Sequence, residues 1–209
     1  MFRKILFFIS ILTIQFATAQ NNTQAEQVLS NLLTTAKTTA IKTGFKLIAT
    51  DKNSTQTTSG TFTLKANKFI LEMDAMKVWF DGKTQWSYIQ QNNEVSITEP
   101  SEKELADTNP MAILSGFKSK CLIRFSGKIK SDQNHCIEMI SNVKNNDIVK
   151  IEVQVNKTNG NLFSIKITTK NGGNSILLTT NFQKGIIIAD NNFAFNPTKY
   201  KGVAINDLR

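Results

Sequence analysis

The chain has 209 residues, of which 40% are hydrophobic and 20% charged, and its formal charge is +9. This composition excludes a wholly disordered protein, and only 3 Pro and 10 Gly exclude collagen-like and proline-rich chains. The positive charge comes from 22 Lys and only 3 Arg. Because recognition of bases and phosphates favours Arg, nucleic acid is not an expected partner.

The first 19 residues predict a cleavable secretory signal peptide. Arg3 and Lys4 form a positive start, residues 5–16 form an apolar stretch, and Ala17-Thr18-Ala19 supplies the small residues that signal peptidase reads. The apolar stretch is well short of the ~20 residues that span a bilayer. We expect cleavage after Ala19 and one exported domain over residues 20–209, with a formal charge of +7. No Cys stands at the cleavage point, so lipidation there is not expected.

The exported chain is predicted to open with a helix. Its apolar residues recur on one helical face: Ala25, Val28, Leu29, Leu32, Leu33 and Ala36. Thr23 and Glu26 have the spacing of a capping box, in which each side chain bonds the other residue's amide. Thr38 and Gly44 mark the end of the helix.

From Gly44 onward the apolar period changes to two, which indicates β-strands. The Asp81-Gly82 and Asn159-Gly160 turns indicate an antiparallel meander. Strands are predicted near residues 45–50, 61–65, 68–73, 76–80, 85–88, 95–97, 121–125, 137–139, 149–155, 163–167 and 176–182. Residues 193–195 and 203–205 add one or two edge strands.

One short helix interrupts the strands. Thr108 or Asn109 can cap it, Pro110 suits its first position, and residues 111–114 lead to Gly116. A helix this short must dock on an apolar surface. About eleven strands and two helices predict a mainly β chain with a single curled sheet, since twisted open sheets rarely stay flat beyond ~10 strands. The inner face is then either packed shut or holds an apolar ligand.

Residue patterns typical of catalysis are missing from the sequence. His135 precedes Cys136, and neighbours on a strand point to opposite faces, so they do not form a catalytic pair. Glu99, Glu102 and Glu104 are expected in a solvated loop. No phosphate-binding glycine loop or nucleophile elbow is present. The chain is therefore not expected to be an enzyme or to bind a metal or cofactor.

The two cysteines leave the question of a disulfide open. Export permits a bridge between Cys121 and Cys136. A hairpin that turns near residues 131–134 would not place them opposite each other, and sequence alone cannot assign the connection.

Residues 81–88, with the sequence DGKTQWSY, resemble the DGKT-x-W-x-Y hairpin of the outer-membrane lipoprotein carrier family, the LolA-type periplasmic chaperones. Other segments resemble the same family in the same order along the chain: residues 60–64 with Phe69, 109–114, 159–164, and 193–197 with 202–205. The likeness spans most of residues 20–209.

The resemblance implies an unclosed, strongly curved antiparallel β-barrel with helices over its mouth. It also implies a monomeric periplasmic carrier that holds lipoprotein acyl chains inside, collects its cargo from an ATP-driven inner-membrane complex and delivers it to the outer membrane; the acceptor is not specified. Phe69 matches an aromatic residue at the cavity mouth, and residues 111–114 match the lid. The residues expected to contact lipid are Leu29, Leu32, Leu33, Phe62, Leu64, Phe69, Leu71, Met73, Met111, Ile113 and Leu114.

The chain departs from the family pattern just before Phe69. The family has an Arg there that latches the lid, whereas this chain reads Lys65-Ala66-Asn67-Lys68. Lys65 or Lys68 could substitute, although Lys lacks the rigid multi-donor fork of Arg.

Three other readings remain open. An envelope protein of the same fold could bind or sense other lipids. A structural surface protein would have a fully packed core and no ligand. An exported hydrolase is the weakest reading, and the family's lipidated acceptor is disfavoured because no lipidation Cys follows the signal.

Overall fold

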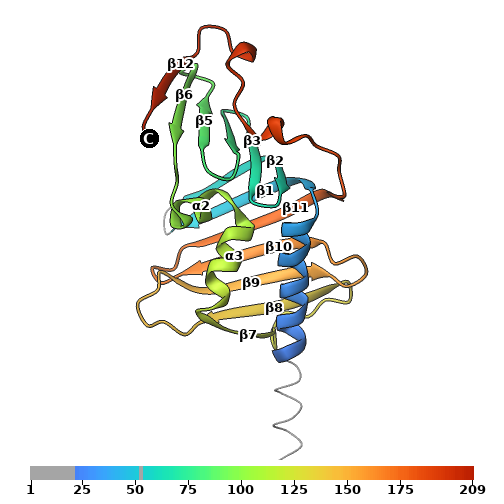
Figure 1. Cartoon of the computed structure of the whole chain (residues 1–209). Helices are drawn as coiled ribbons and strands as arrows, with labels where there is room; N and C mark the ends of the chain where they lie inside the picture. The colour runs from blue at the N-terminus through green and yellow to red at the C-terminus, as the bar shows by residue number, and fades with distance from the viewer. Residues whose placement is uncertain (1–21, 52–53) are drawn as a thin grey trace, which may run out of the picture.

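The computed structural model describes residues 22–51 and 54–209, so the predicted signal peptide lies outside the described residues. Twelve strands form one curved sheet in the order β12-β6-β5-β4-β3-β2-β1-β11-β10-β9-β8-β7 (Figure 1). The strands are β1 (Ile41–Asp51), β2 (Ser54–Lys65), β3 (Lys68–Met73), β4 (Met76–Phe80), β5 (Gln85–Ile89), β6 (Glu94–Thr98), β7 (Cys121–Phe125), β8 (Asn134–Ser141), β9 (Ile148–Asn156), β10 (Leu162–Thr169), β11 (Asn174–Lys184) and β12 (Ala204–Asp207). The sheet is unclosed, with β12 and β7 at its two ends.

The mainly β fold predicted from the sequence is confirmed. Neighbouring strands pair antiparallel, except that β12 lies parallel to β6, with Ile205 opposite Val95. Pairing of β1 with β11 joins the two halves of the chain, and this places Leu47 opposite Leu177. The expected strand at residues 193–195 is wrong: a 3-10 helix, η1 (Asp190–Phe193), brings Phe193 into a fully buried position there.

The N-terminal helix covers residues 22–38 of the described chain, and it lies across one face of the sheet together with α3 (Figure 1). We call this the inner face. Residues 22 and 23 are already helical, so the predicted capping box at Thr23 is wrong. Over the described ranges, no helix is long and apolar enough to cross a bilayer.

A second helix, α2 (Glu102–Thr108), replaces the solvated loop expected around Glu102 and Glu104. The side chain of Ser101 accepts from the Glu104 amide, and the Ser101 amide donates to Glu104 Oε2 at 2.8 Å. This Ser-x-x-Glu capping box is visible in the sequence and predicts a helix start. The bonds from Ser101 also lower the pKa of Glu104.

The third helix, α3 (Pro110–Lys118), begins where the sequence predicted. Asn109 Oδ1 accepts from the amides of Met111 and Ala112, at 2.9 and 3.4 Å. The helix continues past Gly116, its predicted end, because the next residue, Phe117, is buried against the sheet.

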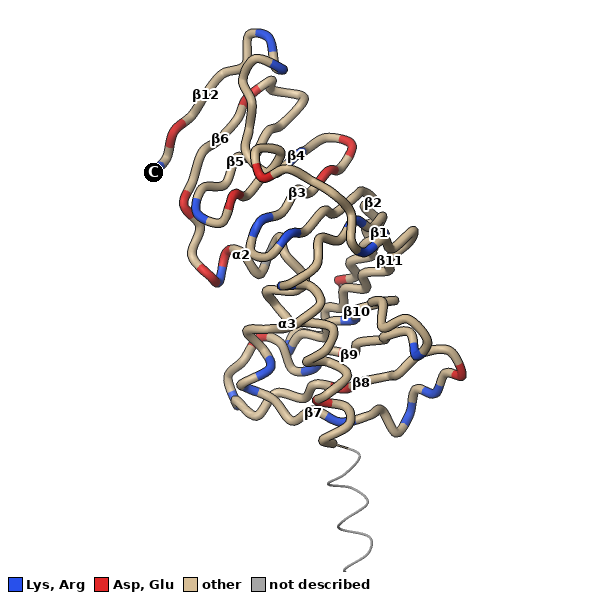
Figure 2. The backbone as a smooth tube through the Cα atoms, turned by 45° about the vertical axis from the view of Figure 1, so that its right-hand side comes forward, with Lys and Arg blue, Asp and Glu red and all other residues tan. Residues whose placement is uncertain are grey.

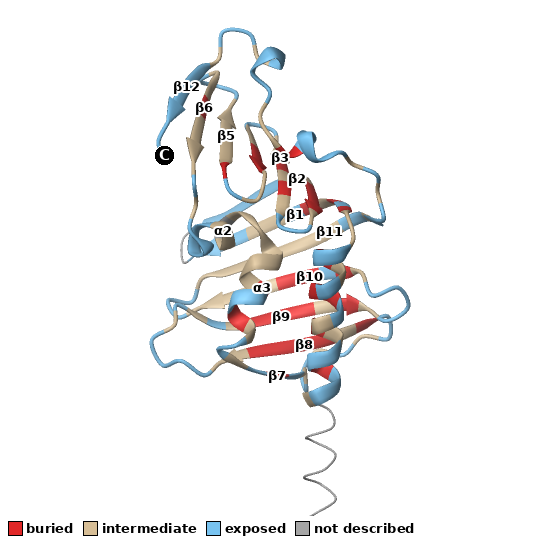
Figure 3. Cartoon of the chain, in the orientation of Figure 1, coloured by how far each residue is buried: buried red, intermediate tan, exposed pale blue. Residues whose placement is uncertain are grey.

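Two buried clusters lie on the inner face (Figure 3). The first core packs the N-terminal helix and α3 onto β7–β10, with Leu29, Leu114 and Met139 fully buried. The second core packs the inner residues of β1–β4, including Phe62, Phe69 and Phe80, around the end of the N-terminal helix. Half-buried residues, among them Met111 and Leu177, touch both cores.

The C-terminal segment covers the outer face of β3–β5. Trp79, which points away from the second core, meets the rings of Phe195 and Tyr200 at 5.5 and 5.8 Å. Tyr88 of β5 also packs on Tyr200, at 4.6 Å. Lys65 and Lys68 bind Asp190 at 2.6 and 2.7 Å, which ties η1 to the β2–β3 turn.

The cysteines are both free thiols. The β7–β8 register pairs Cys121 with Ser141 and Phe125 with Ile137, so Cys136 lies at the far end of the hairpin from Cys121. Burial, with the Glu26 charge as a smaller cause, raises the pKa of Cys121 to about 11.

Candidate functional site

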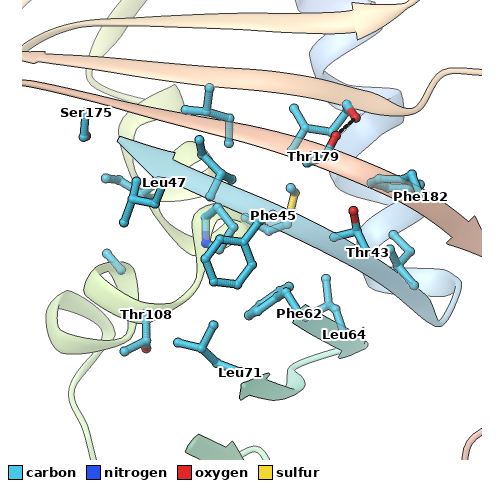
Figure 4. Close-up of a pocket in the computed structure, with 18 of the residues that line it drawn as sticks. Thr43, Phe45, Leu47, Phe62, Leu64, Leu71, Thr108, Ser175, Thr179 and Phe182 are labelled. Carbon is cyan, nitrogen blue, oxygen red and sulfur yellow. Dashed lines mark hydrogen bonds between the residues drawn. The ribbon is translucent and has the colours of Figure 1, made fainter. Parts of the chain in front are cut away.

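An apolar cavity of about 420 Å³ lies between the two cores (Figure 4). Its walls come from β1–β4, β10 and β11 on one side, and from the N-terminal helix, α2 and α3 on the other. Figure 4 labels Phe45, Phe62 and Leu71 among the residues that line the cavity. This volume falls within the ~300–1,000 Å³ typical of small-molecule sites.

The polar residues of this wall are neutral, and most have their hydrogen bonds satisfied by the protein. Thr43 Oγ1 donates to the Thr180 carbonyl at 2.9 Å, and Thr179 Oγ1 donates to the Leu162 carbonyl at 2.5 Å. The Thr108 hydroxyl donates to the Leu105 carbonyl. Because none of the lining side chains is charged, the cavity suits a hydrocarbon ligand.

Seven of the eleven residues predicted to contact lipid line this cavity: Leu32, Phe62, Leu64, Leu71, Met73, Met111 and Ile113. Leu29 and Leu114 are instead fully buried in the first core, and Leu33 lines a second, neighbouring cavity. Contact of these residues with lipid stays a prediction.

The structure places Phe69 behind the cavity wall. It is fully buried, and its ring packs between Phe62 and Phe80 at centroid distances of 5.6 and 5.3 Å. Phe69 does not line the cavity, so the expected position at the mouth is not what the structure shows.

Of the 22 residues that line the cavity, 15 were not predicted to contact lipid. Ile165, Ile167 and Leu177 stand at inward positions of β10 and β11, and Phe45 and Leu47 face them from β1. The alternation of Phe45 with Leu47 and of Ile165 with Ile167 was visible in the sequence. In β11 the alternation predicted from the sequence ran through Ile176 and Leu178 and did not select Leu177. The meeting of these strands was not visible, because the β1–β11 pairing joins residues more than 120 positions apart.

Neither Lys65 nor Lys68, the two residues considered as substitutes for the family's Arg, forms a hydrogen bond or ion pair with α3. Lys65 Nζ binds Asp190 and the Ile188 carbonyl, and Lys68 Nζ binds Asp190. These hydrogen bonds lower the pKa of Asp190 to about 2. Lys65 and Lys68 therefore hold the C-terminal segment, and Ala66 and Asn67 face α3 across the second cavity.

Charge is spread over the molecule. Figure 2 shows Lys and Arg in both halves of the sheet, with Asp and Glu among them. On the outer face the nearly buried Glu138 and Glu152 stand opposite each other. Arg124 pairs with Glu138 at 3.2 Å and Lys150 with Glu152 at 3.0 Å. His135 lies apart from the cavity, and its ring stacks on Phe125.

Two similar solved structures with TM-scores of 0.50 or more support the fold. An uncharacterized conserved protein from Thermus thermophilus matches with a TM-score of 0.59 at 11% identity, over 88% of this chain and 99% of that one. A DUF1329 family protein from Desulfovibrio piger matches with a TM-score of 0.50 at 9% identity, over 87% and 99%. A LolA superfamily protein from Nitrosomonas europaea has a TM-score of 0.42 at 10% identity, over 82% and 97%.

Comparison of the sequence with known proteins gives the family. A search of curated proteins found no match. The profile of the outer membrane lipoprotein carrier protein LolA matches residues 16–172, which is most of the chain. The resemblance seen at residues 81–88 is thereby confirmed. The chain belongs to the LolA family of outer membrane lipoprotein carrier proteins.

Proposed function

We propose that residues 20–209 form a periplasmic carrier that shields lipoprotein acyl chains in the apolar cavity and moves them from the inner to the outer membrane. The observation that carries the proposal is the cavity of about 420 Å³ with no charged residue in its wall. Membership of the LolA family supports the same reading.

The size of the cavity suits one acyl chain. If a methylene group takes about the space of a water molecule, ~30 Å³, the cavity holds roughly 14 methylenes. Burial of each methylene is worth about 0.8 kcal/mol, so a filled cavity gains roughly 11 kcal/mol. A gain of this size offsets much of the cost of taking a chain out of a membrane.

Transport of this kind needs no catalytic group. The carrier would take its cargo from an ATP-driven complex in the inner membrane and release it to a site that binds acyl chains more tightly. Release then follows from the difference in affinity, and the wall of the cavity has only to exclude water.

Mass spectrometry of the protein purified from its native envelope tests the proposal. We expect acylated lipoproteins to co-elute with the natural protein and to be lost from an Ile113→Asp variant, which places a carboxylate in the cavity wall. Co-elution of phospholipids or fatty acids without lipoproteins would support the lipid-binding alternative. Absence of any lipid from the natural protein would support a structural role.

A further inference from the structure

A second cavity, of about 410 Å³, lies beside the apolar cavity. It is open to solvent, and three elements line it: the N-terminal helix with Lys37, the β2–β3 turn with Ala66 and Asn67, and α3 with Asn109 and Ser115. Leu64 and Met111 line both cavities, so the two cavities adjoin at these side chains. Met is flexible and can change rotamer at low cost. One elongated ligand could therefore occupy both spaces.

The second cavity differs from the first in its polar groups. In the apolar cavity, the hydroxyls of Thr43, Thr108 and Thr179 donate hydrogen bonds to backbone carbonyls. Lys37, Asn67 and Ser115 are exposed, and within the described chain their side chains have no hydrogen-bond partner in the protein. Asn109 is half-buried and uses only its oxygen, to cap α3. These donors face solvent and are available to a ligand.

The charge of the second cavity is positive. Lys37 is the one charged residue in its lining, and no carboxylate pairs with Lys37 in the described ranges. The amides of Asn67 and Asn109 and the hydroxyl of Ser115 add neutral donors near this cation. Such a group of donors suits oxygen atoms that carry negative charge.

We propose that the second cavity binds the anionic head group of a lipid whose acyl chain fills the apolar cavity. The proposal rests on the proposed function, because it requires the apolar cavity to accept a chain. It extends the range of ligands to acidic lipids, which would be bound more tightly than neutral lipids with the same chain.

Two lipids that differ only in the head group test this proposal. We would measure the affinities of palmitoyl lysophosphatidylglycerol and of monopalmitoylglycerol for the exported chain by calorimetry. We expect the anionic lipid to bind about tenfold more tightly, the difference typical of one charge-assisted hydrogen bond. Lys37→Gln should remove that difference and leave the affinity for monopalmitoylglycerol unchanged, and Ser115→Ala should reduce it.

Lys46→Gln is the matched control, because Lys46 is exposed and alternates with the inward residues Phe45 and Leu47. It removes the same charge from the outer face and should leave both affinities unchanged. Equal affinity of the natural protein for both lipids, or equal effects of Lys37→Gln and Lys46→Gln, would overturn the head-group site.

Binding of monopalmitoylglycerol would still support the carrier in that case, whereas failure of both lipids to bind would overturn both proposals. Displacement of the anionic lipid by millimolar inorganic phosphate would show a free-phosphate site and overturn the head-group assignment.

Discussion

Consecutive residues of α3 have different surroundings and should respond differently to substitution. Leu114 is fully buried in the first core, whereas Ile113 is half-buried and lines the apolar cavity. A substitution at Leu114 leaves a void among packed side chains. A polar substitution at Ile113 places the new group at a cavity, where it can stay hydrated.

We expect Leu114→Ala to lower the free energy of unfolding by roughly 2–5 kcal/mol, the range found for core leucines of this kind. Ile113→Asp should lower it by only about 1 kcal/mol and should weaken the binding of an apolar dye. Denaturant unfolding and dye titration measure the two effects. A fall of ~10 °C or more in the thermal midpoint of Ile113→Asp would place Ile113 in the structural core.

The contacts of Asp190 predict a pH dependence at acid pH. Its pKa is lowered to about 2, first by its hydrogen bond with Lys65 and then by that with Lys68. A carboxyl group whose pKa is lower in the folded state contributes stability above its unfolded pKa, near 3.8, and loses it as the pH falls toward 2. The thermal midpoints of the natural protein and of Asp190→Asn should therefore differ equally at pH 7 and pH 5, and the difference should shrink below pH 4 and disappear only below pH 2. A difference that is as large at pH 2 as at pH 7 would exclude this ion pair as its source.

Phe69 shows what alternation along one strand cannot decide. Its inward direction was predicted from the period of β3 and is seen in the structure. Whether an inward residue reaches the cavity depends on its neighbours from other strands. Phe62 and Phe80 enclose Phe69, whereas Leu71, two positions further along β3, lines the cavity. The sequence thus predicted the face and not the distance from the cavity.

The β2–β3 turn is an element with a strained residue. Ala66 has a φ of +55°, a conformation that costs most residues roughly 1–2 kcal/mol and glycine much less. Ala66→Gly should relieve this strain, but the greater entropy of glycine in the unfolded chain offsets part of the gain. We therefore expect the free energy of unfolding to rise by only about 0.5 kcal/mol. Urea unfolding would measure the change.

Gly82→Ala provides the opposite comparison in the next turn. Gly82 has a φ of +104°, and a Cβ atom there would lie 2.6 Å from Asn67 Nδ2. This substitution should destabilise the protein by more than about 1 kcal/mol. Stabilisation by Gly82→Ala, or destabilisation by Ala66→Gly, would contradict the strain described at these turns.

Most elements could be predicted from the period of apolar residues, and the remaining ones depended on distant contacts. The eleven predicted strands between residues 45 and 182 are all present. The alternation in β5 predicted which residues share a face of the strand. It did not predict that Tyr88 packs on the outer face, because the ring that covers Tyr88 there, Tyr200, comes from the C-terminal segment. Phe193 likewise belongs to a 3-10 helix because it is buried against β3, which local pattern does not encode.

At the scale of the molecule, the cavity exists because the curved sheet carries two cores instead of one. The first core closes around β7–β10 and the second around β1–β4, and each buries its own aromatic and aliphatic residues. The space between them is therefore not needed for stability. A structural protein with a single packed core would have filled it, since protein interiors leave few voids larger than a water molecule.

A titration of residues 20–209 with a fluorescent palmitate analogue tests the central claim, that this space binds an acyl chain. Ala106 lines the apolar cavity from α2, so Ala106→Trp should fill it, while Ala204→Trp adds the same side chain at an exposed position of β12. We predict one saturable site in the natural protein and in Ala204→Trp, and at least tenfold weaker binding in Ala106→Trp. No saturable binding by the natural protein, or undiminished binding by Ala106→Trp, would contradict the account.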